Sequence, residues 1–168
     1  MPEGQRMKLR FAAWLALAAL VACADQASKW YMTQWLGSGS MVTVTEFFKL
    51  ILVHNPGAAF SFLADQSGWQ RWFFIVLGIV ICGWLLALTW QHRAERALPL
   101  AFSLIIGGAV GNIYDRMAHG AVVDFLYFHV GKYGWPAFNL ADSAITVGVV
   151  LMLWSQFRPH RSTKETAQ

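Results

Sequence analysis

The sequence predicts an integral membrane protein with an all-α core of four transmembrane helices, a small β-sheet outside the bilayer and an amphipathic helix at the interface. Three observations predict this class. Of the 168 residues, 57% are hydrophobic and only 13% are charged, whereas about a quarter of the residues in a soluble domain are charged. Four apolar runs approach the roughly 20 residues that cross a bilayer. Basic residues are concentrated at alternate ends of these runs.

The transmembrane helices are expected at about residues 11–28, 72–90, 98–114 and 136–157, within a single membrane domain, 1–168. The second run carries no charge, and the third ends at Asp115. The first and fourth each contain an acid, Asp25 and Asp142. A cleaved signal peptide leaves a soluble or anchored remainder. Because three further apolar runs follow the first, we interpret the first run as a transmembrane helix.

The distribution of Lys and Arg predicts the orientation. Eight lie among the 28 residues of 1–10, 91–97 and 158–168, against five among the 68 residues of 25–71 and 115–135. Because cytoplasmic flanks are enriched in basic residues, both termini are placed in the cytoplasm. Nucleic acid is not expected as a partner, since the basic residues form no long stripe.

The two outer segments, about 29–71 and 115–135, carry strand signals. The run at 41–54 (MVTVTEFFKLILVH) predicts two short strands before the breaker at 55–57, and the run at 120–135 predicts another strand followed by a Gly-rich turn. Open strand edges cannot face lipid, so these strands should form a sheet above the bilayer plane. An interfacial helix is expected after residue 57, with its lipid side formed by Phe60, Phe62 and Leu63.

Asp142 is the first candidate for a functional residue. An ionisable group within a span is costly and marks a functional site by default, although Asp142 could also only bond a neighbouring helix. Asn139 precedes it by three residues on the same helical face, and Asp124 lies 18 residues upstream in VVDF. The chain leaves the membrane after residue 114 and returns near 136, so both carboxylates can meet at the outer boundary. Two close carboxylates share a proton, as aspartic protease chemistry requires.

Other polar or small residues near these acids could serve either structure or substrate binding. The run at 107–112 (GGAVGN) offers a small-residue face, either for close helix packing or for substrate. Asp25 and Lys29, four residues apart, are spaced for an ion pair. Asp115 and Arg116 are equally compatible with an interfacial charge pair and with substrate binding. Asn55 and Gly57 more often form a turn than a site.

Five sequence blocks resemble, in order and spacing, the lipoprotein signal peptidase family, also called signal peptidase II. These blocks are DQASK (25–29), NPGAAFS (55–61), GGAVGNIYDR (107–116), VVDF (122–125) and FNLADS (138–143). The resemblance covers about residues 10–157. Because it rests on five ordered blocks, it is far more specific than any one of them.

The resemblance implies an inner-membrane aspartic endopeptidase that removes the signal peptide from diacylglyceryl-modified prolipoproteins, cutting before the lipidated cysteine near the periplasmic face. No metal or organic cofactor is implied, and membrane lipids and globomycin-like inhibitors are implied as partners. The catalytic dyad falls on Asp124 and Asp142. The resemblance places the substrate-binding residues at Asn55, Asn112, Arg116 and Asn139, and the supporting residues at Asp25, Lys29, Gly57, Gly108, Gly111 and Asp115.

Two other functions stay open from the residues alone. A small proton-coupled transporter would use intramembrane acids as a relay, although the acids cluster at one boundary. A lipid-anchored protein matured at Cys23 would use the LVAC at 20–23, which looks like a lipoprotein cleavage signal. We favour the peptidase, and expect the substrate's signal helix to pack on the face at 107–111, with the outer segments as a lid.

Overall fold

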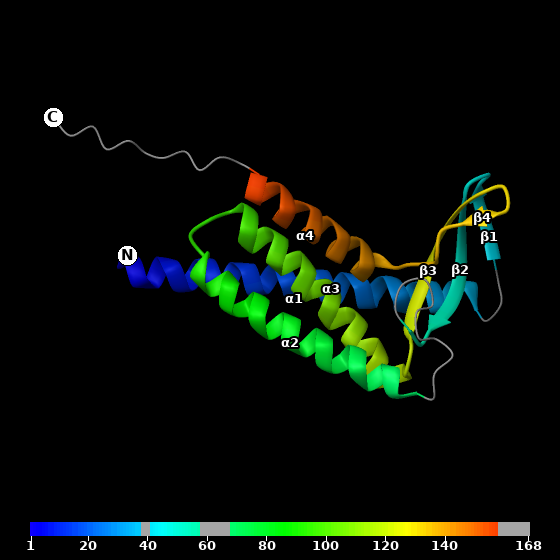
Figure 1. The fold of residues 1–168 in the computed structure, drawn as a ribbon, viewed down its shortest axis with the longest axis horizontal. Coiled ribbons are helices and arrows are strands. Elements are labelled where there is room, and N and C mark those ends of the chain that lie inside the picture. Colours follow the sequence, from blue (N-terminus) through cyan, green and yellow to red (C-terminus); the bar gives the residue numbers. More distant parts are fainter. Residues whose placement is uncertain (38–40, 58–67, 158–168) are drawn as a thin grey trace.

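The computed structural model describes residues 1–37, 41–57 and 68–157. It contains four helices side by side and a sheet at one end of the bundle (Figure 1). The helices are α1 (Glu3–Leu36), α2 (Trp69–Gln91), α3 (Ala97–His119) and α4 (Leu140–Phe157). All four are long and apolar enough to cross a membrane. The predicted fold class of a multi-pass membrane protein with a small sheet is confirmed.

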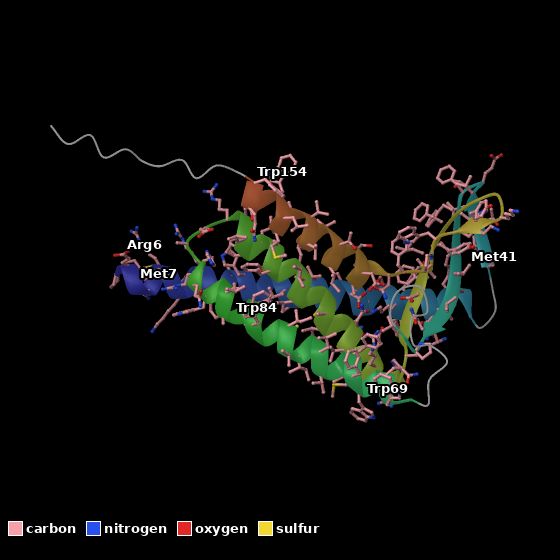
Figure 2. All side chains as sticks on the ribbon, in the orientation of Figure 1. Arg6, Met7, Met41, Trp69, Trp84 and Trp154 are labelled. Carbon is pink, nitrogen blue, oxygen red and sulfur yellow. The ribbon has the colours of Figure 1, made fainter. Side chains whose placement is uncertain are left out.

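Helix α3 is the centre of the bundle and packs against each of the other three helices (Figure 1). Its small residues allow this close packing. A Cβ atom at Gly108 would lie 2.4 Å from the carbonyl oxygen of Ala141 in α4, so only glycine fits there. The outer faces of α2 and α4 are instead lined with exposed apolar side chains, as expected of lipid-facing helices. Trp84 and Trp154 are two of them, and Figure 2 shows Trp154 pointing away from the bundle.

Helix α1 is longer than the predicted span of 11–28 and includes residues 29–36, which were assigned to the outer segment. The prediction followed hydropathy and stopped at Lys29, but this lysine is buried by polar partners within the bundle. The helix also runs uninterrupted through Cys23, and Asp25 is fully buried two residues later. The LVAC segment is therefore an integral part of the folded bundle.

Two other helices also differ in extent from the predicted spans. Helix α3 continues through residues 115–119, and α4 begins at Leu140 instead of 136. Residues 136–139 are not helical because Phe138 forms backbone hydrogen bonds with Leu126, as an isolated bridge on the sheet. The predicted interfacial helix, with its lipid side at Phe60, Phe62 and Leu63, falls outside the described residues.

The sheet has four antiparallel strands in the order β1-β2-β3-β4. Their bounds are Met41–Thr45, Phe48–Asn55, Val122–Val130 and Tyr133–Gly134, which confirms the predicted strands in both outer segments. Residues 122–125 at the start of β3 are buried against the bundle. The register pairs Val53 with Asp124 and Asn55 with Val122, so the end of β2 lies beside the acid of β3.

Candidate active site

Asp124 and Asp142 face the same cavity at the sheet end of the bundle. Asp124 comes from the buried start of β3, and Asp142 from the first turn of α4. The cavity has a volume of about 580 Å³, and both aspartates line it. Its polar wall also includes Asn55, Asn112 and Arg116. The structure therefore brings together residues from β2, α3, β3 and α4, which are far apart in sequence.

Asn139 connects the two aspartates. Its side-chain nitrogen donates to the Oδ1 atom of Asp124 at 2.7 Å, and its backbone N–H donates to the Oδ2 atom of Asp142 at 3.3 Å. In return, the backbone N–H of Asp142 donates to the Asn139 Oδ1 atom at 2.9 Å. This reciprocal pair has the geometry of a helix capping box, which satisfies N–H groups at the start of α4. Asn139 is fully buried, so its position is tightly defined.

Two further side-chain amides donate to the pair. The Nδ2 atom of Asn112 lies 2.8 Å from the Oδ1 atom of Asp142, and the Nδ2 atom of Asn55 lies 3.1 Å from the Oδ2 atom of Asp124. The Oδ1 atom of Asn55 in turn accepts the backbone N–H of Gly57 at 3.0 Å, so this turn also orients the Asn55 amide. Each carboxyl group therefore accepts hydrogen bonds from two neutral donors.

The environment of Asp124 favours its protonated form. Burial, together with the nearby carboxylate of Asp142, raises the pKa of Asp124 to about 7. The hydrogen bonds from Asn55 and Asn139 and the charge of Lys29 oppose the shift. A carboxyl group with this pKa holds or releases a proton near neutral pH, which suits acid and base chemistry.

Arg116 turns toward the cavity and does not pair with Asp115. Its guanidinium group donates to the carbonyl oxygen of Gly57 at 2.8 Å and to that of Asn112 at 3.3 Å, and it lies 5.0 Å from the centre of the Phe74 ring. Of the two interpretations of Asp115 and Arg116 that the sequence left open, the structure does not support the interfacial charge pair. Arg116 remains the cation that lines the cavity.

Asp115 pairs with a lysine from another helix. The Nζ atom of Lys29 lies 2.7 Å from the Asp115 Oδ2 atom and 2.7 Å from the Asp25 Oδ2 atom. The expected pair between Asp25 and Lys29 is confirmed, but Asp115 as a second acid was missed. Close contact of α1 and α3 requires Gly111, where a Cβ atom would come within 2.3 Å of the Asp25 carboxylate. The sequence indicated this pairing only through the position of Asp115, an acid at the end of an otherwise apolar helical run.

The glycines at 107–111 do not provide a surface for substrate. Gly107, Gly108 and Gly111 are all buried against α1 and α4. The expectation that a signal helix packs on this face was wrong, because the small residues serve packing within the bundle. The apolar cavity wall, which sequence reasoning missed, comes from the chain before α4 and from its outer face: Trp135, Pro136, Ala137, Phe138, Ile145 and Val147.

The bundle with its strongly apolar helices and its buried carboxylate pair defines a multi-pass membrane protein with an acidic site at one end. The family model described as signal peptidase (SPase) II matches residues 17–158. The chain therefore belongs to the signal peptidase II family and is a protease.

Relatives and solved structures agree with this assignment. The chain is 64% identical over 152 residues to the lipoprotein signal peptidase of Azoarcus sp. (strain BH72), covering 90% of this chain and 86% of the relative. It is 52% identical to that of Cupriavidus taiwanensis, covering 86% of this chain and 82% of the relative. A bacterial membrane enzyme structure at 2.3 Å resolution superposes with a TM-score of 0.79 at 29% identity, covering 94% of both chains.

Proposed function

We propose that this chain is an intramembrane aspartic endopeptidase. It removes the signal peptide from diacylglyceryl-modified prolipoproteins and cuts before the lipidated cysteine. The single observation that carries this proposal is the pair of Asp124 and Asp142 on one cavity, connected through Asn139. The names of the relatives, lipoprotein signal peptidases, support the choice of substrate.

In the proposed mechanism the two carboxyl groups share one proton and activate a water molecule. One carboxylate takes a proton from the water as it attacks the scissile carbonyl, while the protonated partner donates a hydrogen bond to the carbonyl oxygen. The raised pKa of Asp124 supports this residue as the proton carrier. Asp142 lies in the first turn of α4, where a helix N-terminus favours negative charge, which supports it as the base.

The remaining cavity residues are placed to bind the substrate backbone. Asn55, Asn112 and Arg116 line the cavity beside the aspartates and present amide and guanidinium groups. The apolar wall suits the small side chains that precede the cysteine. Val147 belongs to both the cavity and the exposed face of α4. We therefore place the substrate's signal helix along this face of α4, with its acyl chains in the lipid.

The proposed location is the bacterial inner membrane, with both termini in the cytoplasm and the site near the periplasmic face. The start of α1, the loop between α2 and α3 and the end of α4 lie together at the end of the bundle opposite the sheet (Figure 1). This end carries the basic residues Arg6, Lys8, Arg10, Arg93 and Arg96, and basic flanks favour the cytoplasm. Globomycin-like inhibitors are expected to occupy the cavity in place of substrate.

Purified protein and two substrates test this proposal. A diacylglyceryl-modified prolipoprotein should be cut, and the mass of the product should begin at the lipidated cysteine. The same precursor with its cysteine replaced by serine cannot be lipidated and serves as the matched control, which should stay intact. Equal cleavage of both precursors, or a product that begins elsewhere, would contradict the proposed specificity. Inhibition by globomycin is the accompanying measurement for the cavity.

A further inference from the structure

Lys29 lies deep in the bundle, although most residues of its helix, α1, are at least partly exposed. Its side chain is 3% exposed. The Nζ atom lies 2.7 Å from Asp25, 2.7 Å from Asp115 and 2.9 Å from the Oδ1 atom of Asn112, so its three donors each have a partner. The long side chain of a lysine can usually extend its ammonium group to water at little cost. The inward orientation therefore indicates a specific role.

The two carboxylates bound to Lys29 also bind the backbone. Asp25 Oδ1 accepts the N–H of Ala141 at 2.9 Å, and Asp115 Oδ2 accepts the N–H of Val123 at 3.2 Å. Each of these N–H groups belongs to the residue immediately before one aspartate of the candidate dyad. Such hydrogen bonds to ionised acceptors are stronger than neutral ones. One lysine thus connects the backbone of β3 with the backbone of α4.

Lys29 also determines which way the Asn112 amide points. An ammonium group can only donate, so the atom of Asn112 that faces Lys29 must be the amide oxygen. The amide nitrogen is then directed at Asp142, where it donates at 2.8 Å. The Nδ2 atom of Asn139 also donates to the Asn112 amide oxygen, at 3.3 Å, so Lys29, at 2.9 Å, is the nearer of two donors that orient the amide. The lysine therefore acts on Asp142 through the Asn112 side chain as well as through the backbone.

We propose that Asp25, Lys29 and Asp115 form a clamp that sets the relative position of Asp124 and Asp142, with Lys29 as its positioning residue. The clamp rests on the proposed function for its role in catalysis. Its structural part, the coupling of the two backbone segments, does not depend on any reaction. Gln26 reinforces the clamp, because its side-chain nitrogen donates to Asp115 at 2.8 Å and to Asp25 at 3.3 Å.

The clamp also has an electrostatic effect on the dyad. The charged groups around Asp124 are Asp142 from α4, Lys29 from α1 and Arg116 from α3. Burial and Asp142 raise the pKa of Asp124, and the positive charge of Lys29 lowers it. Replacing the lysine with an uncharged residue should therefore raise the pKa of Asp124 further above its ordinary value.

Amide hydrogen exchange tests the clamp without cleavage. In Lys29→Met, measured by NMR in detergent micelles, the amides of Val123 and Ala141 should both exchange more than about tenfold faster than in the wild type. Thr89→Val is the control, because Thr89 is a buried polar residue of α2 whose hydroxyl donates to the carbonyl of Leu85 in its own helix. The control should leave both amides unchanged. Unchanged exchange in Lys29→Met, or faster exchange at only one of the two amides, would overturn the clamp.

Cleavage kinetics provide the second readout. Lys29→Met should lower kcat about a hundredfold, a much larger factor than any change in KM, because positioning acts chiefly on the reacting groups. The alkaline limb of the pH profile should move upward with the pKa of Asp124. Wild-type kcat and an unmoved limb in folded Lys29→Met would refute the positioning role. Thr89→Val should match the wild type in both.

A smaller change covers the case in which Lys29→Met does not fold. Asp115→Asn keeps the side-chain volume and the pair between Asp25 and Lys29, and should accelerate exchange at Val123 more than at Ala141. If both amides exchange in Asp115→Asn at the same rates as in the wild type, the clamp is overturned. Failure of the wild-type protein to cut the prolipoprotein would refute the proposed function, while the exchange result would still decide whether the clamp exists.

Discussion

At the end of the bundle away from the sheet, the buried side chains are mainly apolar, with Leu85, Phe102 and Ile105 in one cluster. At the sheet end, the buried side chains include Asp25, Lys29, Asp115, Asp124 and Asn139. The first arrangement stabilises the fold through packing, whereas the second requires every charge to have a partner. The difference indicates that the polar end is maintained for activity, and that the apolar end carries the stability.

Gly111→Ala should have a large effect on activity, although it leaves the side chains of the candidate dyad and of the clamp intact. The new Cβ atom would lie 2.3 Å from the Asp25 carboxylate, so α1 or the clamp must shift. Gly83→Ala in α2 is the matched control, because nothing lies within 4 Å of its Cβ position. The cleavage rate should fall more than about tenfold at Gly111 and stay unchanged at Gly83. Equal rates would show that the close approach does not matter.

Leu85→Ala should separate stability from activity. Leu85 is buried in the apolar cluster, and its truncation should lower the free energy of unfolding by about 2–5 kcal/mol. The specific activity of the folded protein should stay close to that of the wild type. Thermal unfolding in detergent, with cleavage assays below the transition, measures both. A loss of kcat beyond the loss of folded protein would show that the two ends are coupled.

Asn55→Ala should change the pH dependence of cleavage. Its hydrogen bond favours the ionised form of Asp124, so its loss should raise the pKa of Asp124 above about 7. The alkaline limb of the pH profile should move upward, with kcat reduced by about tenfold at the optimum. Asn55→Asp is unsuitable as a control, since it adds a third acid. Thr43→Ala on the exposed strand β1 provides the control and should leave the limb in place.

A further expected effect is on the pH dependence of stability. The pKa of Asp124 is about 7 in the folded protein and 3.8 ordinarily, so the folded state binds more protons between these values. Asp124 therefore stabilises the fold fully below pH 3.8, and this contribution is lost as pH rises through 7, by at most about 1.4 kcal/mol per pH unit. Comparing wild type with Asp124→Asn over this range should show a steeper loss of stability in the wild type. Parallel curves would contradict the raised pKa.

Hydropathy and strand patterns were sufficient to predict the four helices, the sheet and the position of both aspartates near one boundary. These features follow from local composition along the chain. The extent of α1 was not predictable in this way, because burial of Lys29 depends on Asp115, 86 positions later. The reciprocal cap between Asn139 and Asp142 was visible only as a spacing of three.

The use of the small residues in α3 could not be decided from sequence. A run such as GGAVG predicts that another segment packs closely on it. Hydropathy does not say whether this segment is a helix of the same chain or a substrate. The structure places α1 and α4 there, with Gly108 against the backbone of Ala141. Likewise, Asp115 and Arg116 are adjacent in sequence but turn to different partners, Lys29 and the cavity.

Replacing each aspartate of the pair in turn is the most direct test of whether the pair performs the hydrolysis. Asp124→Asn and Asp142→Asn keep the volume of the side chain and remove its acid and base function. Glu95→Gln, an exposed acid at the opposite end of the bundle, is the matched control. Cleavage of the lipidated prolipoprotein should fall at least about a hundredfold in both aspartate variants and remain at the wild-type rate in the control. Wild-type turnover by either folded aspartate variant would contradict the claim that this pair performs the hydrolysis.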